Sequence, residues 1–505
     1  MNIDIKNLPD SHDLLQKIII DMHKELTLYK EKYSNLIESL RLAKQQQFAS
    51  SSEKGLVQPD FFDEPGTPLT EEVADEIDDT DELQSSSRKN HPKRRPLPDY
   101  LPRETICYDI NEEEKICKCG SHMEHIGEEA SEQLQIIPAK VTVIRRVRPK
   151  YACKQCEENV KIAPMPNLLL PKCIATPELV AHTIISKYCD HMPLYRQTAM
   201  WRRMEIDMPR SSLCGWLLKV AELCFPLIEE LKKQIVSYDY TQADESTVQV
   251  LGEMERKNTA KSYMWCYRGG GAHISIVYEY QETRAGEHAK NFLRGFKGYL
   301  QTDAYSGYNW SHDLAEIIHV GCHAHARRPF AELVKINKTP GLAAHALNFY
   351  SKLYAVEKYS RENKLTAEER QYLRLEKSVA ILDNFKLWLD QHLIKTSEQG
   401  KIGKAIRYCL SHWNELTNYL KDGRIEIDNN LTENAIRPFA LGRKNWLFAG
   451  SPSGAKAGAT FYSLIETCKA NGIDPYKYFC AMLNNIRHCR SEDDYRNLLP
   501  QFIVF

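Results

Sequence analysis

Residues 237–251, SYDYTQADESTVQVL, mark a change from helical to strand-like periodicity in this chain. The strand-like pattern returns at 263–268 and, after the glycine turn at 269–271, at 273–280. A short helix is predicted at 285–295, followed by strands at 298–302 and 317–320, the last of which enters a helix at Cys322. This order predicts a mixed sheet with helices packed on its faces.

Two aspartates occupy strand positions of the predicted sheet. Asp244 follows the first strand and Asp303 follows the fourth. If these strands are neighbours, the two carboxylates converge and repel, an arrangement usually kept where a divalent cation compensates it. Oxygen ligands suit magnesium or manganese. For either aspartate alone a turn or cap role is the commoner explanation. Glu245 is the rival for the first position, although alternation sends it to the opposite face.

A helical stretch from about 341 to 419 carries neither a glycine-rich phosphate loop nor a nucleophile elbow, and 422–437, DGRIEIDNNLTENAIR, follows it. Asp428 is expected to cap a helix on which Glu433 and Arg437 share one face. The alternative to a functional role is that Glu433 and Arg437 form a surface ion pair, which would contribute about 0.3 to 0.5 kcal/mol to stability. Arg443 and Lys444 make the neighbourhood basic, as a site for metal and phosphate requires.

Two cysteine pairs precede the sheet, separated by about thirty strand-like residues; they are Cys117, Cys119, Cys153 and Cys156. Paired thiolates bind zinc tetrahedrally, and we expect structural zinc here rather than four free buried thiols. The basic side chains just before the second pair fit a solvated strand face almost as well as a nucleic-acid contact; they are Arg145, Arg146, Arg148 and Lys150.

Residues 175–234 are predicted to be helical, with helices at 176–187 and 193–204, a turn at 205–208, and a third helix capped by Ser211 or Ser212. The turn resembles a helix-turn-helix, but three helices also form a plain bundle. Candidate DNA-reading side chains are Arg196, Arg202, Arg203 and Arg210.

The N-terminal region combines a predicted coiled coil with a charged linker. Apolar positions 15, 19, 22, 26, 29, 33, 36 and 40 repeat every four and three residues, which favours self-association. Residues 60–82 hold eleven acidic side chains and no Lys or Arg, so the rest of the chain carries a net charge of +10. That charge permits a polyanionic partner, and an ordinary solvated surface fits it equally well. A basic cluster lies at 88–95.

The start of the chain and its apolar runs predict neither secretion nor membrane spanning, and the fifteen cysteines fit reduced thiols in a cytosol.

The chain resembles transposases of the insertion sequence 66 family, which belong to the wider Asp-Asp-Glu (DDE) transposases. Matching stretches run in the family's order: 48–54, 97–103, the cysteine pairs, 187–196, 243–247, 302–308, 321–328, 428–438, 442–445 and 472–475. Such a series is far more specific than one motif. Within it, His323 is expected on a helix surface.

The resemblance implies an α+β multidomain protein whose catalytic core has a ribonuclease-H-like mixed sheet. The expected parts are a coiled coil at 10–50, a disordered linker at 55–95, a zinc-binding module at 100–170, a helical DNA-binding region at 175–234, a catalytic domain at 237–450 with a helical insertion at about 340–420, and a C-terminal helical region at 455–505. Carried over by motif, the catalytic carboxylates are Asp244, Asp303 and Glu433. Candidate phosphate contacts are Arg327, Arg328, Arg437, Arg443 and Lys444, each with the competing role of a structural ion pair.

The function implied is metal-dependent DNA cleavage and strand transfer at terminal inverted repeats, with two Mg²⁺ or Mn²⁺ ions held by the three carboxylates. The implied partners are the terminal repeats, target DNA and further copies of the chain, in a bacterial cytoplasm at the nucleoid. Whether small accessory proteins of the same element take part stays open. The alternatives are a catalytically inactive DNA-binding regulator descended from a transposase, and an interaction protein built around its coiled coil.

Overall fold

A computed structural model describes residues 13, 15–26, 29–30, 33, 37, 141–148, 150–152, 160–162, 167–171, 173–336 and 341–503. The four predicted zinc cysteines, the linker at 55–95 and the apolar positions 36 and 40 lie outside the described residues. The chain divides into two compact units, Met1–Thr70 with Asn167–Phe505, and Glu71–Pro166. In the second unit, β1 (Lys150–Ala152) pairs antiparallel with β2 (Val160–Ile162).

The first unit contains the predicted mixed sheet, whose five strands lie in the order β5-β4-β3-β6-β7. The strands β3 (Tyr240–Gln249), β4 (Lys261–Gly269) and β5 (Ser275–Gln281) form an antiparallel meander. β6 (Gly298–Gln301) runs parallel to β3, and β7 (Ile317–Val320) runs parallel to β6. One expectation was wrong in detail: Asp244 does not follow the first strand but lies within it, because β3 continues unbroken to Gln249.

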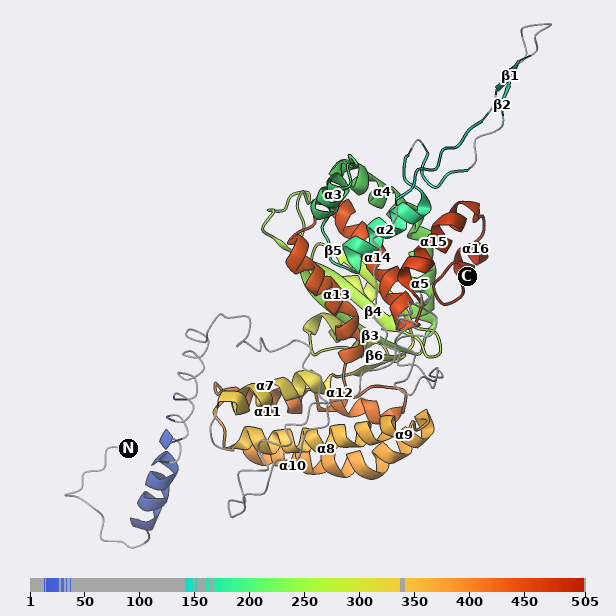
Figure 1. Ribbon diagram of the computed structural model, residues 1–505. Coiled ribbons are helices and arrows are strands. Elements are labelled where there is room, and N and C mark those ends of the chain that lie inside the picture. Colours follow the sequence, from blue (N-terminus) through green and yellow to red (C-terminus); the bar gives the residue numbers. More distant parts are fainter. Residues whose placement is uncertain are drawn as a thin grey trace, which may run out of the picture. The chain divides into compact units, whose positions relative to one another are not determined.

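Helices cover both faces of this sheet (Figure 1). On one face, Tyr278 of β5 lies near Phe439 of α13 (Asn430–Trp446) and Tyr462 of α14 (Pro452–Ala470), with ring centroids 6.4 and 5.6 Å apart. On the other face, Tyr267 of β4 stacks on Phe292 of α6 (Gly286–Phe292) at 3.7 Å. These aromatic contacts bury both surfaces of the central strands, and the hydrophobic effect holds the three layers together.

The helical region before the sheet contains α2 (Pro177–Tyr188), α3 (Leu194–Arg203), α4 (Arg210–Leu223) and α5 (Phe225–Ser237). The hydroxyl of Thr176 accepts the backbone N–H of Leu179 and thereby caps α2. The predicted serine cap of α4 was wrong, because the helix begins at Arg210 with Pro209 in the N-cap position. Proline fixes φ near the value that starts a helix, so it ends the turn without a side-chain cap.

A second hydrophobic core belongs to the helices between β7 and α13. These are α7 (His323–Ile336), α8 (Leu342–Glu362), α9 (Ala367–Leu373), α10 (Val379–Leu393), α11 (Lys401–Ser411) and α12 (Trp413–Thr417), with a π-helical turn, η3, at Arg374–Ser378. We call α8–α12 the insertion; it forms the lower layer in Figure 1. The chain leaves the sheet at β7 and comes back against it at α13, so the insertion begins and ends next to the sheet.

The C-terminal helices α14, α15 (Pro475–Asn485) and α16 (Glu492–Asn497) complete the first unit. Side chains of α14 also protect the sheet edge. Ser463 accepts the backbone N–H of Tyr278 at 2.7 Å, and Thr467 accepts that of Ile276 at 3.0 Å. Because β5 is the edge strand, these contacts satisfy donors that another chain would otherwise pair with.

Among the described residues no single helix is long and apolar enough to span a membrane, while the bent pair α4 and α5, at 48° to each other, meets the length and composition requirement.

Candidate active site

The strand register brings the two predicted aspartates together. β3 and β6 pair in parallel with Thr241 opposite Leu300 and Gln242 opposite Gln301. Continued by two residues, this register sets Asp303 opposite Asp244. Neighbouring strands lie about 4.8 Å apart, so two carboxylates at adjacent positions interact strongly.

Glu433 reaches the same place from α13. Asn429, the N-cap residue of this helix, donates its side-chain amide to the carbonyl of Ala243 at 3.0 Å, and Thr432 donates its hydroxyl to the side chain of Gln242, also at 3.0 Å. Both contacts fix the start of α13 against the part of β3 that precedes Asp244. Glu433 is 1% exposed, so the surface ion pair with Arg437 considered above does not apply.

Burial and neighbouring charges raise the pKa values of Asp244 and Glu433. Burial is the main cause that raises the pKa of Asp244 well above its usual range, and the charges of Glu245, Glu433 and Asp303 raise it further. Burial also raises the pKa of Glu433 to about 7. Both carboxyl groups therefore resist ionisation, as expected of buried acids that lie near other negative charges.

The carboxylate of Glu433 tests whether a divalent cation fits. Neither of its oxygens accepts a hydrogen bond from any described residue. Its ion-pair partners are more distant, with His325 Nδ1 at 3.4 Å and a terminal nitrogen of Arg328 at 3.8 Å. A buried carboxylate without donors is costly, and a cation would supply the missing interaction. The chemistry of this carboxylate therefore fits an oxygen ligand of a hard divalent ion.

Glu245 points elsewhere. Its carboxylate accepts hydrogen bonds from Arg284 Nε at 2.7 Å and from the hydroxyl of Tyr308 at 2.8 Å. The opposite strand supports this placement, because Trp265, which pairs with Glu245, packs against Tyr308 at 5.9 Å. Glu245 is therefore held on the α6 side of the sheet, whereas Asp244 faces α13.

Asp428 was predicted to cap α13, but Asn429 holds the N-cap position. Asp428 lies one residue earlier, and its Oδ1 accepts the backbone N–H of Asn430 at 3.1 Å. Its other oxygen accepts the hydroxyl of Tyr354 from α8 at 2.8 Å. The residue thus ties the insertion to the start of the helix that carries Glu433.

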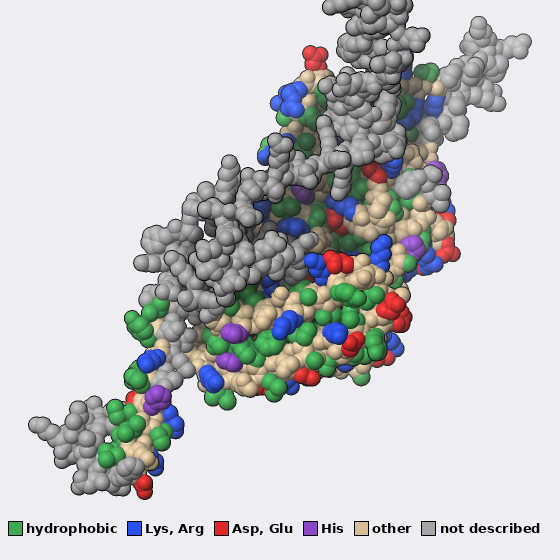
Figure 2. Space-filling view, turned by 60° about the horizontal axis from the view of Figure 1, so that its bottom comes forward, with side chains coloured by type: hydrophobic (Ala, Val, Ile, Leu, Met, Phe, Trp, Pro, Cys, Tyr) green, Lys and Arg blue, Asp and Glu red, His purple; other side chains and the backbone are tan. Residues whose placement is uncertain are grey.

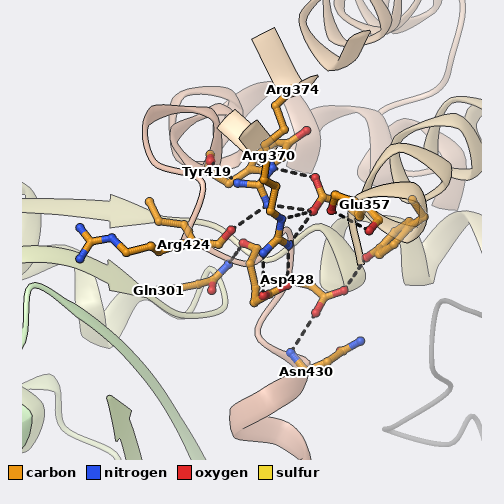
Figure 3. Close-up of polar contacts among 12 residues, drawn as sticks. Gln301, Glu357, Arg370, Arg374, Tyr419, Arg424, Asp428 and Asn430 are labelled. Carbon is orange, nitrogen blue, oxygen red and sulfur yellow. Dashed lines mark hydrogen bonds and ion pairs between the residues drawn. The ribbon is translucent and has the colours of Figure 1, made fainter. Parts of the chain in front are cut away.

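A buried ion network in the insertion supports the same segment (Figure 3). Arg374, which is fully buried, pairs with both oxygens of Glu357 at 2.8 Å and donates to the carbonyls of Tyr419, Asp422 and Ile425. Arg370 bridges Glu357 to Glu426. These contacts fix the backbone of 422–426, which leads directly into α13.

The network continues into the sheet through Gln301. Its side-chain amide donates to the carbonyl of Glu426 at 2.8 Å, and its oxygen accepts from Tyr240 and from Gln242. A buried polar chain therefore connects β3, which carries Asp244, and β6, which leads into Asp303, with the segment before Glu433. Fully satisfied buried networks of this kind hold one geometry.

The predicted DNA-contacting cations lie around this site with different surroundings. Arg443 donates to the carbonyl and, at 2.7 Å, to the hydroxyl of Thr247, so it holds the end of α13 on β3. Lys444 is exposed, whereas Arg327, Arg328 and Arg437 are half-buried. Figure 2 shows Lys and Arg side chains gathered where the surface is hollowed between the insertion and the sheet. Arg196, Arg202, Arg203 and Arg210 are exposed on α3 and at the start of α4.

The sequence analysis did not identify Cys322 and His325 as neighbours of Glu433. It used residues 321–328 only as one of the stretches that resemble the family. Cys322 directly precedes α7 and its sulfur accepts the backbone N–H of Asn429 at 3.2 Å. His325 follows three residues later, which places both side chains on one face of the helix start. His323 was expected on the surface and is instead 1% exposed, with its Nε2 2.8 Å from the carbonyl of Leu416.

Comparisons with known proteins agree along most of the chain. Residues 172–457 match the family model described as "Transposase IS66 family", and residues 114–157 match "zinc-finger binding domain of transposase IS66". Residues 463–501 match "IS66 C-terminal element", and residues 35–106 match "Transposase C of IS166 homeodomain".

Relatives of nearly the same length occur in Sinorhizobium fredii. The protein y4jD is 32% identical over 96% of this chain and 95% of its own length. The protein y4qI is 31% identical over 99% of this chain and 98% of its own length. Both are named as uncharacterized proteins.

Proposed function

The chain belongs to the transposase IS66 family, and from that premise we propose that it is a DNA transposase that cuts and joins DNA at the terminal inverted repeats of its element. The observation that carries the proposal is the approach of Asp244 on β3, Asp303 just after β6, and Glu433 on α13. Structural carboxylates usually have donors, whereas Glu433 has none among the described residues, and the pKa values of Asp244 and Glu433 are both raised.

The proposed catalytic fold is ribonuclease-H-like. Its support is the strand order β5-β4-β3-β6-β7, with an antiparallel meander followed by two parallel strands. In this arrangement β3 is the central strand, Asp244 lies on it, and Asp303 directly follows its parallel neighbour β6. The helices α8–α12 are then an insertion before the helix that carries the last carboxylate.

In the proposed site, Asp244, Asp303 and Glu433 hold two divalent ions, Mg²⁺ or Mn²⁺. When bound, such a pair activates the attacking water or DNA 3'-hydroxyl and stabilises the leaving oxygen of an in-line displacement. The chain's own residues position the ligands. Asn429 and Thr432 hold the start of α13 on β3, and Arg284 keeps Glu245 out of the set.

Cations near the carboxylates would contact phosphates. Arg328 is 3.8 Å from Glu433 and would offset charge on a bound backbone, while Lys444, which is exposed near the end of α13, would contact the backbone farther from the carboxylates. Arg443 already donates to Thr247, and its proposed part is to fix α13 rather than to bind DNA directly.

The remaining parts of the chain have proposed roles in DNA recognition and assembly. Cys117, Cys119, Cys153 and Cys156 would hold a structural Zn²⁺, since the matched zinc-finger segment at 114–157 spans all four. The exposed arginines of α3 and α4 would contact the terminal repeats. The N-terminal helix would join protomers, so that two DNA ends meet in one complex.

The test is cleavage and joining of a labelled DNA carrying the terminal repeats that flank the gene, with Mg²⁺ or Mn²⁺. We compare the intact protein, Asp303→Asn, and Asp313→Asn as an exposed aspartate control. We expect metal-dependent products from the intact protein and the control, and about a hundred- to a thousandfold less from Asp303→Asn at unchanged DNA affinity. Binding without metal-dependent cleavage by any of the three proteins would favour the inactive regulator.

A further inference from the structure

A sulfur, a nitrogen and an oxygen meet on the α7 side of Glu433. The ligand atoms of Cys322, His325 and Glu433 all lie within 4.8 Å of one another. The set differs from the three proposed carboxylates because it contains a soft and a borderline donor. Thiolate and imidazole select zinc-like ions over magnesium.

The distances match a tetrahedral site. His325 Nδ1 and Glu433 Oε1 are 3.4 Å apart, and with bond lengths of about 2.0 to 2.2 Å the edge of a tetrahedral zinc site is about 3.4 Å. Neither atom has a hydrogen-bond partner among the described residues, and the side chain of Glu433 is 1% exposed. Two buried ligand atoms thus lie at the separation that a shared ion would require.

Cys322 presents its sulfur to the site from the start of α7. It directly precedes α7, and its carbonyl accepts the backbone N–H of Ala326 at 3.3 Å, as in the first turn of a helix. Its sulfur accepts the backbone N–H of Asn429 at 3.2 Å. Burial raises the pKa of the free Cys322 thiol well above its usual range, and the charges of Glu433 and Asp428 add to this shift, so an ion that binds here displaces the thiol proton.

We propose that Cys322, His325 and Glu433 form a binding site for a zinc-like divalent cation, with the fourth position open. Glu433 belongs to both donor sets, so an ion bound here would withdraw it from the carboxylate site. This consequence rests on the proposed function: Zn²⁺ would inhibit DNA cleavage supported by Mg²⁺. The site itself depends only on the three residues.

The binding test counts Zn²⁺ per full-length chain by competition with a chromogenic chelator. The variants are Cys322→Ser and His325→Gln, with Cys409→Ser as a control that removes another buried cysteine. We expect the intact protein and the control to bind one more zinc ion than either variant, or to bind that ion about 10- to 100-fold more tightly. Loss of an outer-shell partner alone costs a factor of this size in metal affinity. The cysteine pairs at 117–156 contribute equally to all four proteins.

Serine keeps a hydrogen-bond acceptor for Asn429, and matching circular dichroism spectra would show that each variant is folded. Cobalt substitution gives a second readout, since the thiolate-to-cobalt charge-transfer band should be weaker in Cys322→Ser than in Cys409→Ser. Equal zinc counts, equal affinities and equal cobalt spectra in all four proteins would overturn the site.

Inhibition is measured separately, by adding Zn²⁺ at fixed Mg²⁺. Cleavage by the intact protein should fall at lower Zn²⁺ than cleavage by Cys322→Ser, and equal inhibition of both would overturn the shared role of Glu433. If no protein cleaves DNA, the proposed function fails while the zinc count still decides the site.

Discussion

Glu433 is a carboxyl group that folding buries without a donor. Its oxygens accept no hydrogen bond from the described residues, and burial raises its pKa from 4.5 to about 7. Arg328 opposes this shift, while Asp428 and Asp303 add to it. A buried carboxylate without hydrogen-bond donors lowers the stability of the metal-free protein, and such destabilising groups are common at functional sites.

The stability of the metal-free protein should therefore depend on the ionisation of Glu433. Because its folded pKa is raised, its favourable contribution is present below pH 4.5 and is lost as the pH rises through 7. At pH 8, the free energy of unfolding of Glu433→Gln should exceed that of the intact protein by about 2 to 3 kcal/mol. At pH 5 the two free energies should be nearly equal. Urea unfolding without added Mg²⁺ or Mn²⁺ measures this.

Glu332→Gln, at an exposed position on α7, is the matched control and should show no such pH-dependent gain. A Glu433→Gln protein that is less stable than the intact chain at pH 8 would contradict the burial argument.

The segment before α13 shows how one element positions another. Contacts from the insertion fix both ends of 422–428: Arg374 binds its carbonyls, and Tyr354 binds Asp428. Buried ion pairs such as Arg374 with Glu357 add little net stability, because desolvation offsets their attraction, but breaking one costs about 3 to 5 kcal/mol. The insertion therefore acts on the candidate site by holding the entry to its last helix.

Tyr354→Phe tests this coupling. The change removes the hydroxyl that Asp428 accepts, leaves the ring in place, and should lower stability by about 1 to 2 kcal/mol, because Asp428 stays buried. If the hydroxyl positions α13, cleavage should fall while terminal-repeat affinity stays unchanged. Thermal unfolding and single-turnover cleavage are the two measurements.

Tyr359→Phe removes a hydroxyl from an exposed ring on the same helix and should change neither quantity. Loss of stability in Tyr354→Phe with full cleavage would show that the contact supports the fold alone.

The proposed assembly rests on the N-terminal helix. The described residues between 13 and 37 are helical, and five of its apolar seam side chains are 52 to 67% exposed: Ile19, Met22, Leu26, Tyr29 and Tyr33. A row of apolar side chains at heptad spacing is stable in water when a second helix covers it. This arrangement supports the proposed self-association.

The double change Met22→Lys with Leu26→Lys should convert an oligomer to a monomer, because charges in the seam cannot be buried. Multi-angle light scattering measures the mass. Ile20→Lys places a charge on an equally exposed apolar residue outside the seam and should leave the mass unchanged. A monomeric intact protein would contradict the proposed assembly.

Local patterns along the chain predicted most of the helices and strands. Strand alternation predicted β4 to β7 within a few residues, and helical periodicity predicted α2, α3 and the insertion, since both depend on neighbours only a few positions apart. The errors were also local: the cap of α4 was assigned to a serine although Pro209 precedes it, and β3 was divided at Asp244. Both reflect competing signals within one short segment.

Long-range packing supplied the surroundings of the candidate site. The carboxylate positions were available from the sequence through the strand order and the resemblance. By contrast, the place of Cys322 and His325 beside Glu433, the burial of His323, and the contact of Tyr354 with Asp428 join residues 70 to more than 100 positions apart. A sequence pattern specifies which face of an element is apolar, but not which distant element covers it. That choice is made by the simultaneous burial and hydrogen bonding of all elements, so it emerged only with the folded chain.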